Sequence, residues 1–245
     1  MSVKSAKLEL FEKMERECNS VDNVADISIS HFNKDLSHTS PVEVNWILMC
    51  AIQKRCFKIV RYFVRAGIKV GRLDESTQTA IHIAREGYMT QQDRQEILDL
   101  FFNIYDHLNY TNDNKLSHFH MACENGNVDM IQRFIDHGVD INQRIVEEFS
   151  KDTPLHYAIS SRRIEAIHMM LSNGADPNGR IIHDLTPLNR MCWQITVISP
   201  ENFILFYLST IRMLLQYGSD VNTQDDNGNS PILNLFQCQP DVCTS

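Results

Sequence analysis

One segment of the chain is written twice, and this duplication limits the possible folds more than any other feature of the sequence. The first copy runs from Leu116 to Asn142, and the second runs from Thr153 to Asn178. Identical residues in the two copies stand 36 positions apart, namely His120 and His156, Gly138 and Gly174, and Asn142 and Asn178. A fixed period in this range indicates stacked units, because a single unit of this size cannot bury its apolar face alone.

The residue pattern of the second copy indicates a protein family. It opens with Thr153-Pro-Leu-His156-x-Ala158 and closes with Gly174-Ala-Asp-x-Asn178. This pattern resembles the ankyrin repeat, a unit of about 33 residues with a β-turn finger and two antiparallel helices. The resemblance implies an all-α ankyrin-repeat solenoid of stacked helix-turn-helix units with β-turn fingers. The segment Leu116-Ser-His-Phe-His120 also resembles, more weakly, the expanded ankyrin proteins of arthropod and viral type.

The resemblance divides the chain into three parts. An N-terminal helical cap is expected at residues 1–40, and a partial repeat or C-terminal cap at residues 223–245. Between them, residues 41–222 should hold repeats at approximately 41–72, 73–108, 111–142, 145–178 and 181–222. Caps are expected because the open ends of a stacked array need a polar outer face.

Apolar spacing predicts individual helices. Lys4 to Asn19 should form one helix, and the Ile59, Val60, Phe63 and Val64 stripe should be core. Gly67 fits the left-handed position that ends a helix. The step from Asn178 to Asn222 is 44 residues instead of 36, and we expect the extra length in a loop at residues 195–202.

Composition excludes several classes of protein. The net charge of -8 argues against nucleic acid, whose phosphates need a basic surface, and it allows a partner with a basic segment. No apolar stretch approaches the roughly 18 residues of a membrane-spanning helix. Seven scattered cysteines favour a reduced chain in the cytoplasm or nucleus. We expect a monomer without membrane contact.

Three histidines, His82, His120 and His156, occupy one slot of the repeat. The resemblance implies that they and the preceding hydroxyl residue bond the backbone at a helix start, which satisfies donors that would otherwise lack partners. The structural motif therefore comprises Thr79, His82, Ser117, His120, Thr153, His156, Gly138, Gly174 and Gly218.

An enzymatic interpretation has little support in the sequence. His118, His120 and Cys123 resemble a fragment of a metal site, but zinc needs three or four converging ligands, and no second pair stands at matching spacing. A hydrolase or metal-dependent enzyme using these residues is therefore disfavoured. No phosphate loop or nucleophile motif is present either. We expect no catalytic activity, no cofactor and no metal.

The remaining candidate function is binding at the protein surface. The resemblance implies binding of a protein partner on the concave face and at the finger tips. Trp193 follows the core alanine position on an inner helix, and it either faces the groove or packs under the loop at residues 195–202. Candidate partner-binding residues are Arg144, Glu147, Glu148, Phe149, Lys151, Ile182, His183, Asp184, Trp193, Asp225 and Asp226.

Two functions of the binding class stay open. The chain could mask or tether one partner, as the ankyrin inhibitors of transcription factors do, or it could deliver substrates to a ubiquitin ligase. Residues 223–245 are short for the SOCS-box or F-box-like tail that the second function implies, unless residues 1–40 serve instead.

Overall fold

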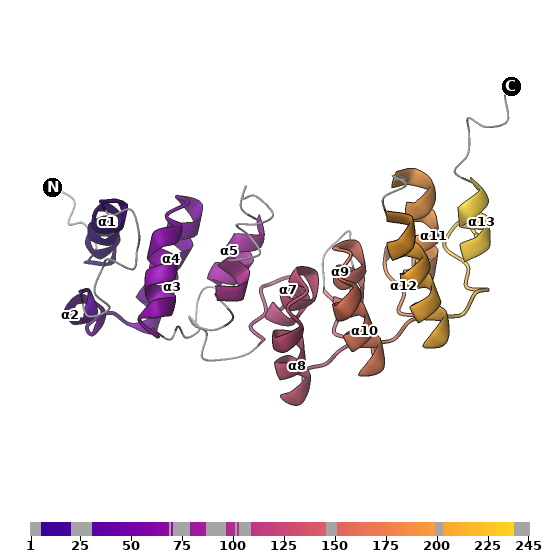
Figure 1. Ribbon diagram of the computed structural model, residues 1–245, viewed down its shortest axis with the longest axis horizontal. Coiled ribbons are helices and arrows are strands. Elements are labelled where there is room, and N and C mark those ends of the chain that lie inside the picture. Colours follow the sequence, from indigo (N-terminus) through magenta and orange to yellow (C-terminus); the bar gives the residue numbers. More distant parts are fainter. Residues whose placement is uncertain are drawn as a thin grey trace, which may run out of the picture. The chain divides into compact units, whose positions relative to one another are not determined.

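The computed structural model describes residues 6–20, 31–68, 70, 79–86, 97–100, 102, 109–145, 151–198 and 203–237. The chain divides into two compact units, residues 1–113 and 114–245. Within the described residues, regular structure is helical (Figure 1). The predicted all-α architecture of paired helices is confirmed for these residues.

Unit 1 is built around one central helix. Its helices are α1 (Ala6–Asn19), α2 (Asn33–Leu36), α3 (Pro41–Gln53), α4 (Phe57–Arg65) and α5 (Ala80–Glu86). Helix α3 packs against α1, α4 and α5, and α1 also contacts α4. The described part of the first helix agrees with the prediction.

The start of α3 shows how sequence sets a helix boundary. Ser40 Oγ accepts from the backbone N–H of Glu43 at 3.3 Å, and Glu43 Oε2 accepts from the backbone N–H of Ser40 at 2.9 Å. This capping box satisfies two backbone donors at the start of the helix, the N–H groups of Ser40 and Glu43. The bond from the Ser40 backbone also lowers the pKa of Glu43.

The predicted core stripe of α4 needs one correction. Ile59, Val60 and Phe63 are buried, but Val64 is only half-buried, and Tyr62 is buried in its place. Tyr62 can enter the core because its hydroxyl accepts a hydrogen bond from the backbone N–H of Phe32 at 3.2 Å.

Unit 2 contains two rows of helices (Figure 1). The inner row is α7 (His118–Asn125), α9 (Pro154–Ser160), α11 (Pro187–Ile198) and α13 (Pro231–Gln237). The outer row is α8 (Val128–Asp136), α10 (Ile164–Ser172) and α12 (Ile204–Gln216). Each helix of a row packs on the next, and each outer helix packs on the inner helix that precedes it in the chain.

The core of unit 2 lies between the two rows. In the first pair, the rings of Phe119 on α7 and Phe134 on α8 lie 5.5 Å apart, and both side chains are buried. Ala122 and Ala158 keep the inner helices close, since each is fully buried. Gly138, Gly174 and Gly218 follow the outer helices with positive φ, a conformation that favours glycine over residues with a Cβ.

The extra length of the fifth repeat lies in longer helices. Helix α11 has 12 residues against 7 in α9, and α12 has 13 against 9 in α10. The predicted loop is therefore wrong for residues 195–198, which continue α11, and residues 199–202 lie outside the described residues. No glycine or proline stands between Pro187 and Pro200 to stop the helix earlier.

Candidate interaction surface

The motif histidines cap the N-terminal ends of the helices on which they lie. Nδ1 of His120 accepts from the Ser117 hydroxyl at 2.7 Å and from the Ser117 backbone N–H at 3.3 Å. His82 makes the corresponding bonds with Thr79, over 2.9 and 3.1 Å. These bonds supply partners for backbone donors at a helix start and leave both imidazole rings buried.

The far side of the imidazole differs between repeats. Nε2 of His120 donates to the carbonyl of Gln143 at 3.0 Å and so fixes the following finger. His156 bonds Thr153 through Nδ1 at 2.8 Å, but its buried Nε2 has no hydrogen-bond partner among the described residues. Burial, aided by the nearby positive charges of Arg190 and Arg144, lowers the pKa of His156 to about 3. His156 is therefore a neutral, structural side chain.

The structure does not bring the metal-like fragment together. Both ring nitrogens of His120 are engaged as described, and Cys123 Sγ lies 3.6 Å from Met170 Sδ in the core. Burial raises the pKa of the Cys123 thiol, which disfavours the thiolate that a metal would bind. Among the described residues, no group of three or more His, Cys, Asp or Glu side chains could hold a metal ion.

The two fingers that begin at Ile145 and Ile181 each have a backbone hydrogen bond at an equivalent position. Ile145 donates to the carbonyl of Asp152 at 3.2 Å, and Ile181 donates to the carbonyl of Leu185 at 2.9 Å. Both isoleucines are buried. The Ile145 side chain packs inward at the base of the finger and adds no apolar group to its tip.

Asp225 takes the equivalent position in the next finger, and it too is buried. Its Oδ1 accepts from the backbone N–H groups of Asn227 and Asn229, each at 2.9 Å, and its Oδ2 accepts from Asn234 Nδ2 at 3.2 Å. The carboxylate holds the turn together and is shielded from a partner. Asp225 therefore leaves the set of candidate binding residues.

An asparagine ladder joins consecutive repeats. The carboxamide of Asn142 donates to the carbonyl of Gly174 at 3.3 Å and accepts from the backbone N–H of Asp176 at 2.8 Å. Asn178 makes the same two bonds with the loop at residues 218–220, over 2.9 and 2.8 Å. Each asparagine thus fixes the position of the next loop, and the fingers that follow the loops are held in register.

An arginine ladder runs beside it along the fingers. The guanidinium of Arg144 donates to the carbonyl of Arg180 at 2.8 Å, and that of Arg180 donates to the carbonyl of Gln224 at 3.1 Å. Arg180 also pairs with Asp184 at 3.0 Å. The two cations connect three successive fingers, while their charge stays at an exposed surface.

The finger at residues 181–185 carries a strained tip. His183 and Asp184 both have left-handed backbones, with φ of 59° and 54°, which residues other than glycine rarely adopt. The next finger holds this conformation, because the backbone N–H of Asp226 donates to the His183 carbonyl at 3.0 Å. His183 Nδ1 lies 3.6 Å from Asp226 Oδ2, and the side chains of His183, Asp184 and Asp226 are each more than half exposed.

Other candidate residues are placed as follows. Arg144 and Lys151 are exposed, Ile182 is half-buried, and Trp193 keeps 45% of its surface exposed on the inner row. Glu147, Glu148 and Phe149 lie outside the described residues. Asn125, the last residue of α7, is buried.

Comparison with known proteins agrees with this geometry. Residues 87–181 match the family model of ankyrin repeats, in three copies. The chain contains ankyrin repeats. None of the curated proteins compared with the chain matches it. Ankyrin repeats are generally protein–protein interaction modules and are typically not enzymes.

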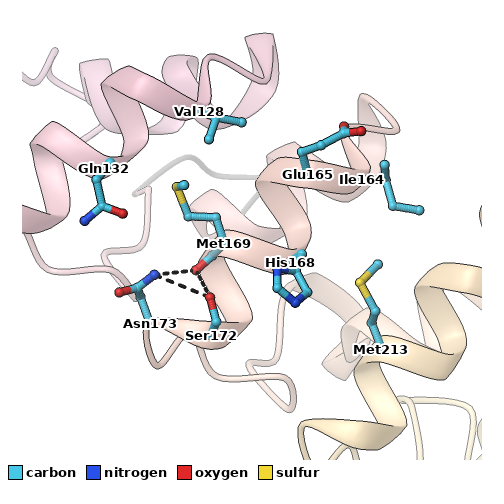
Figure 2. A pocket seen from close by; sticks show the side chains of 9 residues that line it. All are labelled: Val128, Gln132, Ile164, Glu165, His168, Met169, Ser172, Asn173 and Met213. Atoms are coloured by element: carbon cyan, nitrogen blue, oxygen red, sulfur yellow. Dashed lines mark hydrogen bonds between the residues drawn. The ribbon is translucent and has the colours of Figure 1, made fainter.

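The ankyrin helices also form a groove on the outer row, which sequence analysis missed. Its volume is about 530 Å³, and its lining comes from α8, α10 and α12 (Figure 2). Ser172 and Asn173 bond the carbonyl of Met169 instead of reaching into the groove, at 3.0 and 2.8 Å. Small-ligand sites need converging polar groups to orient the ligand, so these contacts favour a simple gap between ankyrin outer helices.

Among the helices in the described part of this ankyrin-repeat chain, none combines the length and apolar character that crossing a bilayer requires.

Proposed function

We propose that the chain binds a protein partner through its finger tips and inner helices and thereby masks or tethers that partner. The observation that carries this proposal is the exposed tip of His183, Asp184 and Asp226, in which the hydrogen bond from the Asp226 backbone N–H to the His183 carbonyl holds the strained backbone of His183 and Asp184. Strained backbone that persists because its surroundings hold it is concentrated at binding and catalytic sites.

A tip that is already ordered favours binding. Association costs free energy when side chains and loops must be immobilised, and the ladders through Arg144 and Arg180 make that ordering part of folding instead. Asp184 and Asp226 at the tip and the cations of Arg144 and Arg180 beside it present both signs of charge, which gives specificity and faster association with a complementary surface. The net charge of -8 supports a partner with a basic segment, as in inhibitors of signalling proteins or transcription factors.

Trp193 supplies a second element of the proposed surface. It is a large side chain with 45% of its area exposed on the inner row. Tryptophan is enriched among the few interface residues that dominate binding energy. We therefore place Trp193 as an apolar contact and the finger tip as its charged counterpart.

Affinity capture with quantitative mass spectrometry tests the proposal. The full chain is compared with a His183→Ala/Asp184→Ala variant and a Trp193→Ala variant. The control is Asp136→Ala/His137→Ala, an exposed pair of the same residue types at the end of α8. We expect one partner to be retained by the wild type and the control and to be depleted at least tenfold in both test variants.

The same experiment separates the alternative function. If cullin-type ligase subunits remain bound to every variant while another protein is lost from the test variants, the chain is a substrate adaptor. If the test variants capture the same proteins as the wild type, the finger tips and Trp193 are not the binding surface.

A further inference from the structure

Exposed apolar side chains gather at one end of unit 2. Among the described residues, the large apolar side chains that are exposed lie between Trp193 and Phe236, with the single exception of Val42. On α12 they are Ile204, Leu205, Leu208 and Leu215, and on α13 they are Ile232, Leu233 and Phe236. Exposed apolar side chains that are clustered mark an interaction surface more often than scattered ones do.

Repeat equivalence shows what two of these side chains lack. Ile232 follows the proline that opens α13, as Leu155 and Leu188 follow the prolines of α9 and α11. Leu155 and Leu188 are 1% and 3% exposed, but Ile232 is 60% exposed. Phe236, five residues after the proline, is 74% exposed, while its counterparts in α9 and α11 are buried.

The earlier repeats show what normally covers these slots. Helix α9 packs against α10, and α11 packs against α12. In the first pair, the Phe119 ring in the same slot lies 5.5 Å from Phe134 of the outer helix. The slots of Ile232 and Phe236 are therefore shaped to receive a helix placed as α8, α10 and α12 are placed.

Helix α12 provides the other side of this exposed surface. Leu215 stands 44 residues after Leu171, which is buried in α10, yet Leu215 is exposed. Arg212 stands 44 residues after His168, whose ring contacts Tyr217 of the following repeat, with 6.3 Å between the ring centres. Arg212 should therefore point toward the next helix in the outer row, and Figure 2 shows His168 in the corresponding place between α10 and α12.

The charges on α12 and α13 select the kind of helix that fits between them. Helices α12 and α13 contain no acidic residue, and Arg212 is their one charged residue. A second copy of the chain would bring another Arg212 and no acid to oppose it, so electrostatics disfavours pairing of two such surfaces.

We propose that α12 and α13 form a docking seat for an amphipathic helix of a protein partner, lined by Leu208, Arg212, Leu215, Ile232 and Phe236. The apolar stripe of the incoming helix covers the exposed Leu, Ile and Phe side chains, and an acidic residue beside the stripe pairs with Arg212. This mode is the helix-in-groove recognition in which residues at i, i+3, i+4 and i+7 anchor the ligand. The seat is separate from the finger tips, so the proposal does not depend on the proposed function.

Fluorescence anisotropy with designed peptides tests the seat. The probe is a labelled 15-residue amphipathic helix with leucines at i, i+3, i+4 and i+7 and one glutamate beside the stripe. A matched peptide carries lysine in place of that glutamate. We expect the full chain to bind the glutamate peptide saturably and at least about tenfold more tightly than the lysine peptide.

Variants of the protein locate the contact. Arg212→Glu should reverse the preference between the two peptides, and Ile232→Asp should weaken binding of the glutamate peptide at least tenfold. Val42→Asp, the same kind of change at an exposed site in unit 1, should bind as the wild type does. Since Ile232 is exposed, its substitution should leave the melting temperature unchanged, which a thermal scan verifies.

Three results would overturn the proposal. The first is absence of saturable binding of the glutamate peptide to the wild type, and the second is an unchanged peptide preference in Arg212→Glu. The third is a light-scattering mass of two chains for the wild type and of one chain for Ile232→Asp, which would assign the seat to a second copy.

Discussion

Asn142 Oδ1 accepts a hydrogen bond from the backbone N–H of Asp176 at 2.8 Å, across the boundary between two repeats. The same carboxamide donates to the carbonyl of Gly174, so that one side chain satisfies a donor and an acceptor of the next loop. Leucines and isoleucines hold helices together in any arrangement that buries them, but this pair of directed bonds sets one register. The fingers occupy defined positions because the loops before them do.

Removal of this carboxamide should weaken the coupling between repeats. Asn142→Ala leaves a carbonyl and an N–H of the next loop without their partner, and we expect the free energy of unfolding to fall by about 1–2 kcal/mol. Urea denaturation followed by circular dichroism measures the change. Asn227→Ala, an exposed asparagine in the turn before α13, is the control and should change stability by less than about 0.5 kcal/mol. Equal losses in the two variants would contradict the role of the ladder.

His156 should make stability depend on pH. Its pKa is lowered to about 3 in the folded chain and is about 6.5 in the unfolded chain. Between these values the unfolded chain binds a proton that the folded chain excludes, so stability is lost as pH falls from about 6.5 toward 3. The slope from this group is at most about 1.4 kcal/mol per pH unit.

The variant His156→Asn tests this dependence, because Asn189 already occupies the equivalent slot of the next repeat. The free energy of unfolding, measured by urea denaturation at several pH values, should fall less steeply with acid in His156→Asn than in the wild type. Identical slopes between pH 4 and 6.5 would show that His156 takes up its proton in the folded state.

Two positions in the turn between paired helices should respond oppositely to substitution. Gly126 has φ of +77°, and a Cβ there would lie 2.8 Å from Cδ of Arg163. Arg55, in the corresponding turn of unit 1, has φ of +59°. Gly126→Ala should destabilise the chain by about 1–2 kcal/mol, and Arg55→Gly should stabilise it by about 0.5 kcal/mol after the greater freedom of unfolded glycine is counted. Chemical denaturation of the two variants measures both effects, and a gain in Gly126→Ala would contradict the strain argument.

Buried thiols should be protected from alkylation. Burial raises the pKa of Cys192 to about 11 and also raises that of Cys123, so the reactive thiolate is scarce near pH 8. We expect peptides containing either cysteine to be modified by iodoacetamide at least about 100-fold more slowly in the native chain than in urea. Mass spectrometry of the digested protein follows both sites, and equal rates in the two conditions would show that these cysteines are not core residues.

Helix pairing and helix starts could be predicted from the sequence because they depend on local spacing. The apolar residues of α4 recur at helical intervals, and the hydroxyl-x-x-His pattern at Ser117 and His120 brings both groups together within one turn. The repeat period extends this information along the chain, since identical spacing produces identical hydrogen bonds. The fold class follows from these local rules.

Burial at the fingers and at the end of unit 2 was decided by tertiary structure. Asp225 reads as a charged tip residue, yet three donors of its own turn and of α13 surround its carboxylate. Phe236 occupies a repeat position that is buried in α9 and α11, yet it is exposed, because among the described residues no outer helix follows α13. The sequence by itself determined the repeating unit, through period and local hydrogen bonding. Which side chains are left for a partner depends on the neighbour that each repeat has in space, and only the tertiary structure supplies that neighbour.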